Sequence, residues 1–147
     1  MMGFVVDASV AIKWFVDEQL AEAARILLGD EYELAAPEFL LLECGNILWK
    51  KVQRGELLIE EARLIRQGLE KQPIDLFSSA RLLEAALEIA MDSKRAVYDC
   101  AYIALAMLID SPLVTADRKL VNALKPGAYA KHVFFVGDLL EAPEAWP

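Results

Sequence analysis

The sequence has few of the residues on which several kinds of site depend. Its two cysteines, Cys44 and Cys100, have neither a CxxC spacing nor further partners. We therefore expect neither a disulfide framework nor a zinc site, and we expect both cysteines to be buried, reduced thiols. The single histidine, His132, excludes a mechanism built on paired histidines, and a Ser/His/Asp triad would depend wholly on it. We interpret His132 as a structural residue at the start of a strand.

Long apolar runs are also missing. The longest candidates, residues 39–42 and 101–109, fall short of the roughly 18 residues that cross a bilayer. Residues 1–6 contain no basic region and are followed at once by Asp7, which is not typical of a secretory signal. We therefore expect a soluble protein with a cytoplasmic location.

Positive charge is scarce. The chain has 15 lysines and arginines against 23 acidic residues, which gives a formal net charge of -8. Phosphate backbones are normally bound by basic surfaces, so this balance argues against strong, sequence-independent binding of nucleic acid. The argument weakens if part of the negative charge is concentrated in a pocket that divalent cations fill.

What the sequence does contain predicts one globular domain over residues 1–147. Hydrophobic residues make up 56% of the chain, and chains of this length bury roughly 70% of their unfolded surface. Periodicity and breakers predict strands at 3–6, 33–36, 74–77, 113–115 and 132–136. They predict helices at 8–16, 19–29, 37–54, 59–71, 78–91, 96–109 and 118–124, with Pro37 in a first helical turn and Ser78 or Ser79 as a cap. This alternation indicates an α/β fold, a three-layer α/β/α sandwich around a short parallel sheet.

Two aspartates directly follow predicted strands. Asp7 follows the first strand and Asp117 follows the strand at 113–115, where ligands bind in open parallel sheets. Each also has an ordinary explanation, because each could cap the helix that begins after it. Asp99 lies near the start of its helix, where the helix dipole favours a carboxylate. Position alone does not make any of them functional.

Glu43 is harder to explain by structure alone. It lies in a helix that is apolar around most of its circumference, which predicts a largely buried helix. A carboxylate there loses hydration unless a cation or hydrogen-bond donors compensate. Asn46, three residues further on, presents a second oxygen on the same face.

Together the four acids, Asp7, Glu43, Asp99 and Asp117, come from four separate elements. Carboxylates gathered by a fold repel one another, and some stay protonated unless divalent ions neutralise them. Oxygen ligands favour Mg²⁺ or Mn²⁺, and such a site suits hydrolysis of a phosphodiester by activated water. The hydroxyls of Ser9 and Thr115 could orient a metal, a water or a phosphate at the same edge, although local capping is their ordinary role.

Four short motifs occur in an order that closely resembles the PIN-domain family. They are Val6-Asp7-Ala8-Ser9-Val10, Leu42-Glu43-Cys44-Gly45-Asn46, Tyr98-Asp99-Cys100-Ala101 and Thr115-Ala116-Asp117. Each motif is weak by itself, but the ordered set is specific and the resemblance covers nearly the whole chain. Within the family, the size and motif order are most similar to the VapC toxins of prokaryotic toxin–antitoxin pairs.

The resemblance implies a Mg²⁺- or Mn²⁺-dependent endoribonuclease that forms a homodimer. It also implies a small antitoxin protein that covers or enters the acidic site, often with an arginine. The residues that match the family's acidic positions, as metal ligands and catalytic residues, are Asp7, Glu43, Asp99 and Asp117. The residues that match its frequent polar companions are Ser9, Asn46 and Thr115. All four acids are present, so nothing in the pattern suggests an inactive member.

Basic and aromatic residues near these motifs are less informative. Those that could contact an RNA backbone are Lys13, Lys94, Arg95, Arg118 and Lys119. We favour Arg95 and Arg118 among them, although such residues are more often plain surface charge. Trp14 and Trp49 lie on apolar helical faces and are interpreted as core or interface residues rather than as stacking platforms for bases.

Two other readings of the sequence stay open. A haloacid-dehalogenase-like phosphatase also begins with an apolar strand that ends in aspartate, but its chemistry needs a second aspartate where this chain has Ser9. A PIN-like module could instead bind RNA or a protein without cutting anything. The four intact acids argue against this second alternative.

Overall fold

The computed structural model describes residues 2–141 and 146, which contain a five-stranded parallel sheet of order β3-β2-β1-β4-β5. The strands are β1 (Met2–Val6), β2 (Tyr32–Pro37), β3 (Ile74–Phe77), β4 (Leu113–Thr115) and β5 (Val133–Phe135). The chain adds β2 and β3 on one side of β1, and then β4 and β5 on the other. The order therefore reverses between β1 and β4, which is where ligands bind in sheets of this type.

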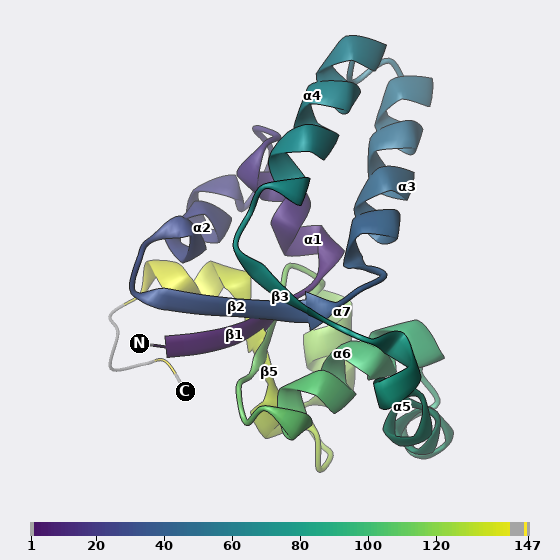
Figure 1. Ribbon diagram of the computed structural model, residues 1–147. Helices are drawn as coiled ribbons and strands as arrows, with labels where there is room; N and C mark the ends of the chain where they lie inside the picture. The colour runs from purple at the N-terminus through teal and green to yellow at the C-terminus, as the bar shows by residue number, and fades with distance from the viewer. Residues whose placement is uncertain (1, 142–145, 147) are drawn as a thin grey trace.

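Helices cover both faces of the sheet, so the predicted three-layer α/β/α architecture is confirmed. The helices are α1 (Ala8–Ala11), α2 (Ala21–Arg25), α3 (Leu40–Gln53), α4 (Ile59–Glu70), α5 (Ser79–Ser93), α6 (Val97–Leu108) and α7 (Arg118–Leu124). Short 3₁₀ turns add η1 (Ile12–Trp14), η2 (Ile26–Leu28), η3 (Ala130–His132) and η4 (Val136–Leu140). Figure 1 shows α1 and α2 on one side of the sheet and α5 and α6 on the other, while α3 and α4 project as a hairpin.

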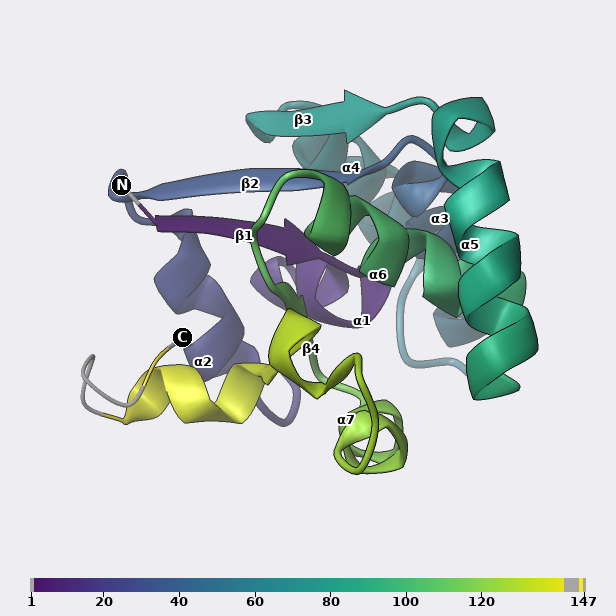
Figure 2. The same ribbon diagram turned by 90° about the horizontal axis from the view of Figure 1, so that it is seen from below.

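The centre of the sheet is buried on both faces. Phe4, Val5 and Val6 of β1 have no exposed surface, as expected for the middle strand of a parallel sheet. Helix α6, whose residues 100–106 are all buried, packs against β1, β2 and β4 and crosses the sheet in Figure 2. This packing fixes the carboxyl ends of β1 and β4 relative to the first turn of α6.

Some predicted boundaries differ from the structure. Pro37 is not in a helix; it is the last residue of β2, paired with Phe77, and α3 begins at Leu40. A proline is tolerated at a strand end because it interrupts no ladder beyond it. Ser78 is the N-cap of α5, but its side chain makes no capping bond, and Glu38 Oε1 instead accepts the Ser79 N–H at 3.2 Å.

The remaining elements lie close to their predicted places. The strands at 74–77 and 113–115 and the helix at 118–124 match their predictions, and β5 begins at Val133, one residue after His132. The α-helix predicted at 8–16 is shorter in the structure, because α1 ends at Ala11 and the chain continues as the 3₁₀ turn η1. The single domain over 1–147 stays a prediction, since positions 1, 142–145 and 147 lie outside the described residues. None of the helices seen in residues 2–141 has the length and apolar character that a bilayer crossing requires.

Candidate active site

A cavity of about 540 Å³ opens at the carboxyl end of the sheet, where the strand order reverses. All four predicted acids line it, and so do Ser9 and Asn46. The acids come from the ends of β1 and β4 and from the first turns of α3 and α6. The fold therefore brings together side chains that are far apart in the sequence. We call this space the acidic cavity.

Asp7 and Asp117 both cap the helix that follows them, which is the ordinary role expected of each. Asp7 Oδ1 accepts the Val10 N–H at 3.2 Å at the start of α1. Asp117 Oδ1 accepts the N–H groups of Lys119 and Leu120, at 3.0 and 3.2 Å, at the start of α7. Capping fixes the direction of each carboxylate without removing it from the cavity wall, so the structural and functional roles are compatible.

Two hydroxyls join the ends of β1 and β4. Ser9 Oγ donates to Asp7 Oδ1 at 2.6 Å and accepts the Ala116 N–H at 3.0 Å. Thr115 Oγ1 accepts the Asp117 N–H at 3.1 Å. Thr115 is completely buried and does not line the cavity, so it supports the site from behind rather than facing a ligand.

Glu43 and Asp99 are held by neighbouring side chains. The Tyr102 hydroxyl donates to Glu43 Oε1 at 2.5 Å, and the Arg95 guanidinium lies 3.5 Å from Asp99 Oδ2. Arg95 Nε is buried and has no hydrogen-bond partner within the described part of the chain. Each helical acid is thus oriented by one partner, as the two strand-end acids are oriented by backbone N–H groups.

In three of the four acids, the observed hydrogen bonds end on a single oxygen. The accepting oxygens are Oε1 of Glu43, Oδ2 of Asp99 and Oδ1 of Asp117. For Glu43, Asp99 and Asp117, no donor from residues 2–141 reaches the second oxygen. A carboxylate accepts at both oxygens, so each of these three acids keeps acceptor capacity for a ligand.

Burial makes two of the acids reluctant to ionise. Loss of hydration raises the pKa of Asp7 to about 6, against the opposing hydrogen bonds of Ser9, Thr115 and Val10, and Glu43 raises it further. Burial also raises the pKa of Glu43 above its ordinary value. The hydrogen bond from Tyr102 lowers this pKa, and the charge of Asp99 raises it. Both directions agree with the expectation that uncompensated carboxylates in one pocket retain protons.

The donor chemistry of the acidic cavity fits a hard divalent cation. Its side chains offer carboxylate and amide oxygens, and neither cysteine nor His132 lines it. Within residues 2–141, however, no group of three histidine, cysteine or acidic side chains is arranged so that it could hold an ion as it stands. The oxygens face one space but do not form a preassembled coordination shell.

The structure adds three aromatic residues that were not among the predicted site residues. Phe39, Tyr98 and Tyr102 line the cavity, and both tyrosine rings meet the Phe39 ring edge-on, with centroids 5.7 and 5.5 Å away. Tyr102 lies three residues after Asp99 in α6, which places the two on neighbouring positions of one helical face. That spacing is the signal that could have identified it.

The helix that carries Glu43 is more exposed than its apolar sequence predicts. Leu42 is 79% exposed and Trp49 is 56% exposed, because α3 projects from the sheet together with α4. Trp14 instead lies in the core and donates from its indole to the Ala24 carbonyl, as predicted for a core residue. The two cysteines are buried free thiols, also as predicted.

The five basic candidates are not all free to meet a ligand. Lys13 forms an ion pair with Glu18 at 3.0 Å, and the Arg118 guanidinium lies 3.7 Å from the centroid of the Phe135 ring. Lys94 ends α5 in the left-handed region, with φ of 60°. Of the five, Arg95 is the one whose side chain forms an ion pair with an acid of the cavity in the described residues.

A parallel α/β/α sandwich with acids converging at its topological switch point is the arrangement of a PIN domain. The PIN domain family model matches residues 4–124, and the chain belongs to this family. It is 35% identical over 123 residues to Ribonuclease VapC3 of Pyrobaculum aerophilum, covering 82% of this chain and 94% of that protein. It is 30% identical over 116 residues to Ribonuclease VapC9 of Mycobacterium tuberculosis, covering 79% and 87% respectively.

Solved structures agree on the fold. The crystal structure of PAE2754 from Pyrobaculum aerophilum matches with a TM-score of 0.71 and 25% identity, covering 95% of this chain and 87% of that one. A toxin-antitoxin complex from Klebsiella pneumoniae matches with a TM-score of 0.59 and 14% identity, covering 90% and 97%. At that identity the second likeness concerns the fold alone.

Proposed function

We propose that this protein is a Mg²⁺- or Mn²⁺-dependent endoribonuclease and the toxin of a toxin–antitoxin pair. The observation that carries the proposal is the convergence of Asp7, Glu43, Asp99 and Asp117 on one cavity, where the hydrogen bonds of Glu43, Asp99 and Asp117 each end on a single oxygen. The relatives named ribonucleases cover about four fifths of the chain and support the substrate class.

In this proposal the four acids and Asn46 hold the divalent ion, and their neighbours hold the acids. Ser9 orients Asp7, Tyr102 orients Glu43, Arg95 orients Asp99, and the N-terminus of α7 orients Asp117. When bound, the ion supplies an activated water and a Lewis acid for the phosphodiester. No protein nucleophile is needed, which suits a cavity without histidine or cysteine on its wall.

The electrostatics of the cavity support the same proposal. The raised pKa values of Asp7 and Glu43 mean that the residues around these carboxylates do not fully offset their negative charge. A bound divalent cation would offset this negative charge, and Asp7, Glu43, Asp99 and Asp117 are the residues that would hold it.

The partners follow from the same family membership and are part of the proposal. They are an RNA substrate, a small antitoxin protein that covers the acidic cavity, and a second copy of this chain. The exposed Leu42 and Trp49 of α3 supply apolar surface for a protein contact. The cytoplasmic location stays a prediction.

A non-catalytic PIN module is the one alternative that an observation favours. That observation is the lack, within residues 2–141, of three acids already arranged around an ion. The match to the PIN domain family removes the basis of the phosphatase alternative. In addition, the Ser9 hydroxyl is already hydrogen-bonded to Asp7 and to the Ala116 N–H.

Cleavage of a mixed RNA pool with Mn²⁺ tests the proposal. We expect cleavage by the wild type and a loss of roughly a thousandfold or more in Asp7→Asn and Asp99→Asn, because each removes a charged oxygen that stabilises the transition state by several kcal/mol. Fragment release is measured by gel electrophoresis, and circular dichroism checks that both variants fold.

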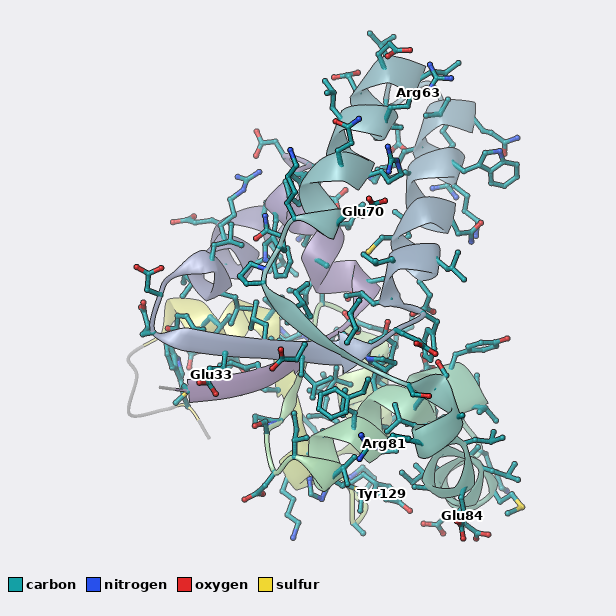
Figure 3. The ribbon with its side chains drawn as sticks, viewed as in Figure 1. Glu33, Arg63, Glu70, Arg81, Glu84 and Tyr129 are labelled. Carbon is teal, nitrogen blue, oxygen red and sulfur yellow. The ribbon has the colours of Figure 1, made fainter. Side chains whose placement is uncertain are left out.

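The exposed Glu84 of α5, labelled in Figure 3, provides the matched control. Glu84→Gln removes one carboxylate outside the cavity and should cleave as the wild type does. RNA binding without any Mn²⁺-dependent cleavage would establish the non-catalytic alternative. Equal cleavage in all four proteins would remove the role of the acids.

A further inference from the structure

A second cavity adjoins the acidic one, and its charge is opposite. It has a volume of about 340 Å³ and is lined by Ser9, Ile12, Lys13, Glu18, Ile47, Lys50, Lys51 and Arg54. We call it the basic cavity. Ser9 and Ile47 also line the acidic cavity, so the two spaces share a wall.

The basic cavity concentrates charge that is scarce in the rest of the chain. Four cationic side chains and one carboxylate line it, which gives a formal charge of +3 in a protein whose net charge is -8. Repulsion among such cations opposes this arrangement unless an anion offsets it. Glu18 offsets only part of it.

Glu18 holds two of the lysines in place. Lys13 Nζ lies 3.0 Å from Oε1 and Lys51 Nζ lies 2.7 Å from Oε2, and both lysine side chains are more than four fifths buried. Burial opposes ionisation of Glu18, but the hydrogen bonds of Lys51 and Lys13 lower its pKa below the ordinary value. The carboxylate therefore stays charged and orients both ammonium groups.

These ammonium groups keep unused donors. Each lysine ammonium has three N–H donors, and within the described residues both Nζ atoms donate to Glu18 alone. Lys50 and Arg54 are exposed at the end of α3, and in the same residues neither forms an ion pair. An anion entering this space would meet prepositioned donors from η1 and from α3.

We propose that the basic cavity binds a backbone phosphate of the RNA strand, next to the phosphate that the acidic cavity cleaves. The inference rests on the proposed ribonuclease function. A polynucleotide carries anions at regular intervals, so one strand can present one phosphate to the acidic cavity and another to the basic cavity across the Ser9–Ile47 wall. This contact would fix the position of the strand without reading its sequence.

The test measures binding of a fluorescein-labelled single-stranded RNA of mixed sequence by fluorescence anisotropy. All proteins carry Asp99→Asn, so that the RNA stays intact, which a gel verifies. In the double variant Lys50→Ala/Arg54→Ala we expect roughly tenfold weaker binding. The slope of log K against log salt should become shallower by about 0.7 for each phosphate that the variant no longer neutralises.

Arg63 and Arg81 give a control that removes the same charge elsewhere. Both are exposed, and Figure 3 shows Arg63 at the outer end of α4 and Arg81 on α5. The Arg63→Ala/Arg81→Ala protein should bind RNA with the affinity and salt slope of its parent. Equal weakening in both double variants would mean diffuse attraction, and no weakening in either would also overturn the subsite.

Two further outcomes separate this inference from the proposed function. With Asp99 restored, the cavity variant should raise KM for RNA cleavage with little change in kcat. Binding weakened by the variant in a protein that cuts no RNA would keep the subsite and reject the nuclease. Unchanged RNA affinity, together with weaker binding of a labelled polyglutamate peptide, would overturn the subsite in favour of an acidic protein segment.

Discussion

Asp7 and Glu18 are both partly buried carboxylates, and they stand on either side of one wall with opposite properties. In the acidic cavity, burial and the nearby Glu43 raise the pKa of Asp7 to about 6. In the basic cavity, Lys51 and Lys13 lower the pKa of Glu18 despite its burial. The difference lies in the partners: Glu18 has its cations built into the chain, whereas Asp7 has hydroxyl and N–H donors but no lysine or arginine within the described residues.

The two cavities therefore differ in how far their own residues offset their charge. In the basic cavity, Glu18 offsets part of the cationic charge and orients Lys13 and Lys51, whose remaining N–H donors stay available. In the acidic cavity no cationic side chain contacts Asp7 or Glu43 within the described residues, so burial raises the pKa of both carboxyls. Under the proposed function, a divalent cation would offset this negative charge.

The largest expected effect is on the stability of the metal-free protein when Asp7 becomes Asn. The folded pKa of Asp7 lies above its ordinary value, so its stabilising contribution is complete below about pH 4 and is lost as pH rises through about 6. Asp7→Asn should therefore be more stable than the wild type at pH 8, by up to about 3 kcal/mol, and equal to it near pH 4. Urea unfolding in EDTA across this pH range measures the difference.

Glu18→Gln should behave in the opposite way in the same experiment. The folded pKa of Glu18 is lowered, so its contribution is present above its ordinary pKa and is lost as pH falls through the folded value. Removing this charge should destabilise the protein by about 1 kcal/mol at neutral pH, and high salt should reduce the effect. Stability changes of the same sign in both variants would contradict the comparison.

A smaller effect is expected from Tyr102→Phe. The change removes the hydroxyl that donates to Glu43 and keeps the ring that packs edge-on against Phe39. We expect roughly fivefold weaker Mn²⁺ binding, which corresponds to about 1 kcal/mol, the usual net contribution of one hydrogen bond. Isothermal titration calorimetry measures the affinity directly.

Tyr98→Phe is the matched control for that change. Tyr98 is on the same helix, lines the same cavity and meets the same Phe39 ring, but no hydrogen bond joins it to an acid in the described residues. Its loss of a hydroxyl should leave Mn²⁺ affinity unchanged. If the two variants bind Mn²⁺ equally, Tyr102 does not position Glu43.

The strand-end part of the site could be predicted from sequence because its signals are local. An apolar run followed by aspartate places Asp7 and Asp117 at strand ends, and parallel topology brings those ends to one edge. The capping role of both residues could be anticipated for the same reason. The strands themselves were predictable from apolar runs between breakers, apart from boundaries such as Pro37.

The rest of the site depends on contacts between distant segments. The Tyr102–Glu43 bond joins residues 59 positions apart, and the Lys51–Glu18 bond joins residues 33 apart. The exposure of Leu42 and Trp49 depends on the projection of α3 and α4 from the sheet. Apolar composition alone could not distinguish that projection from a buried helix, because it does not specify which neighbours cover the helix.

Mn²⁺ binding tests the central claim most directly. Electron paramagnetic resonance of Mn²⁺ titrated with protein measures the free ion. We expect the wild type and the Glu84→Gln control to bind it alike, and Asp7→Asn and Asp99→Asn to bind it at least about tenfold more weakly. Equal Mn²⁺ affinity in all four proteins would contradict the claim that these acids form the metal site.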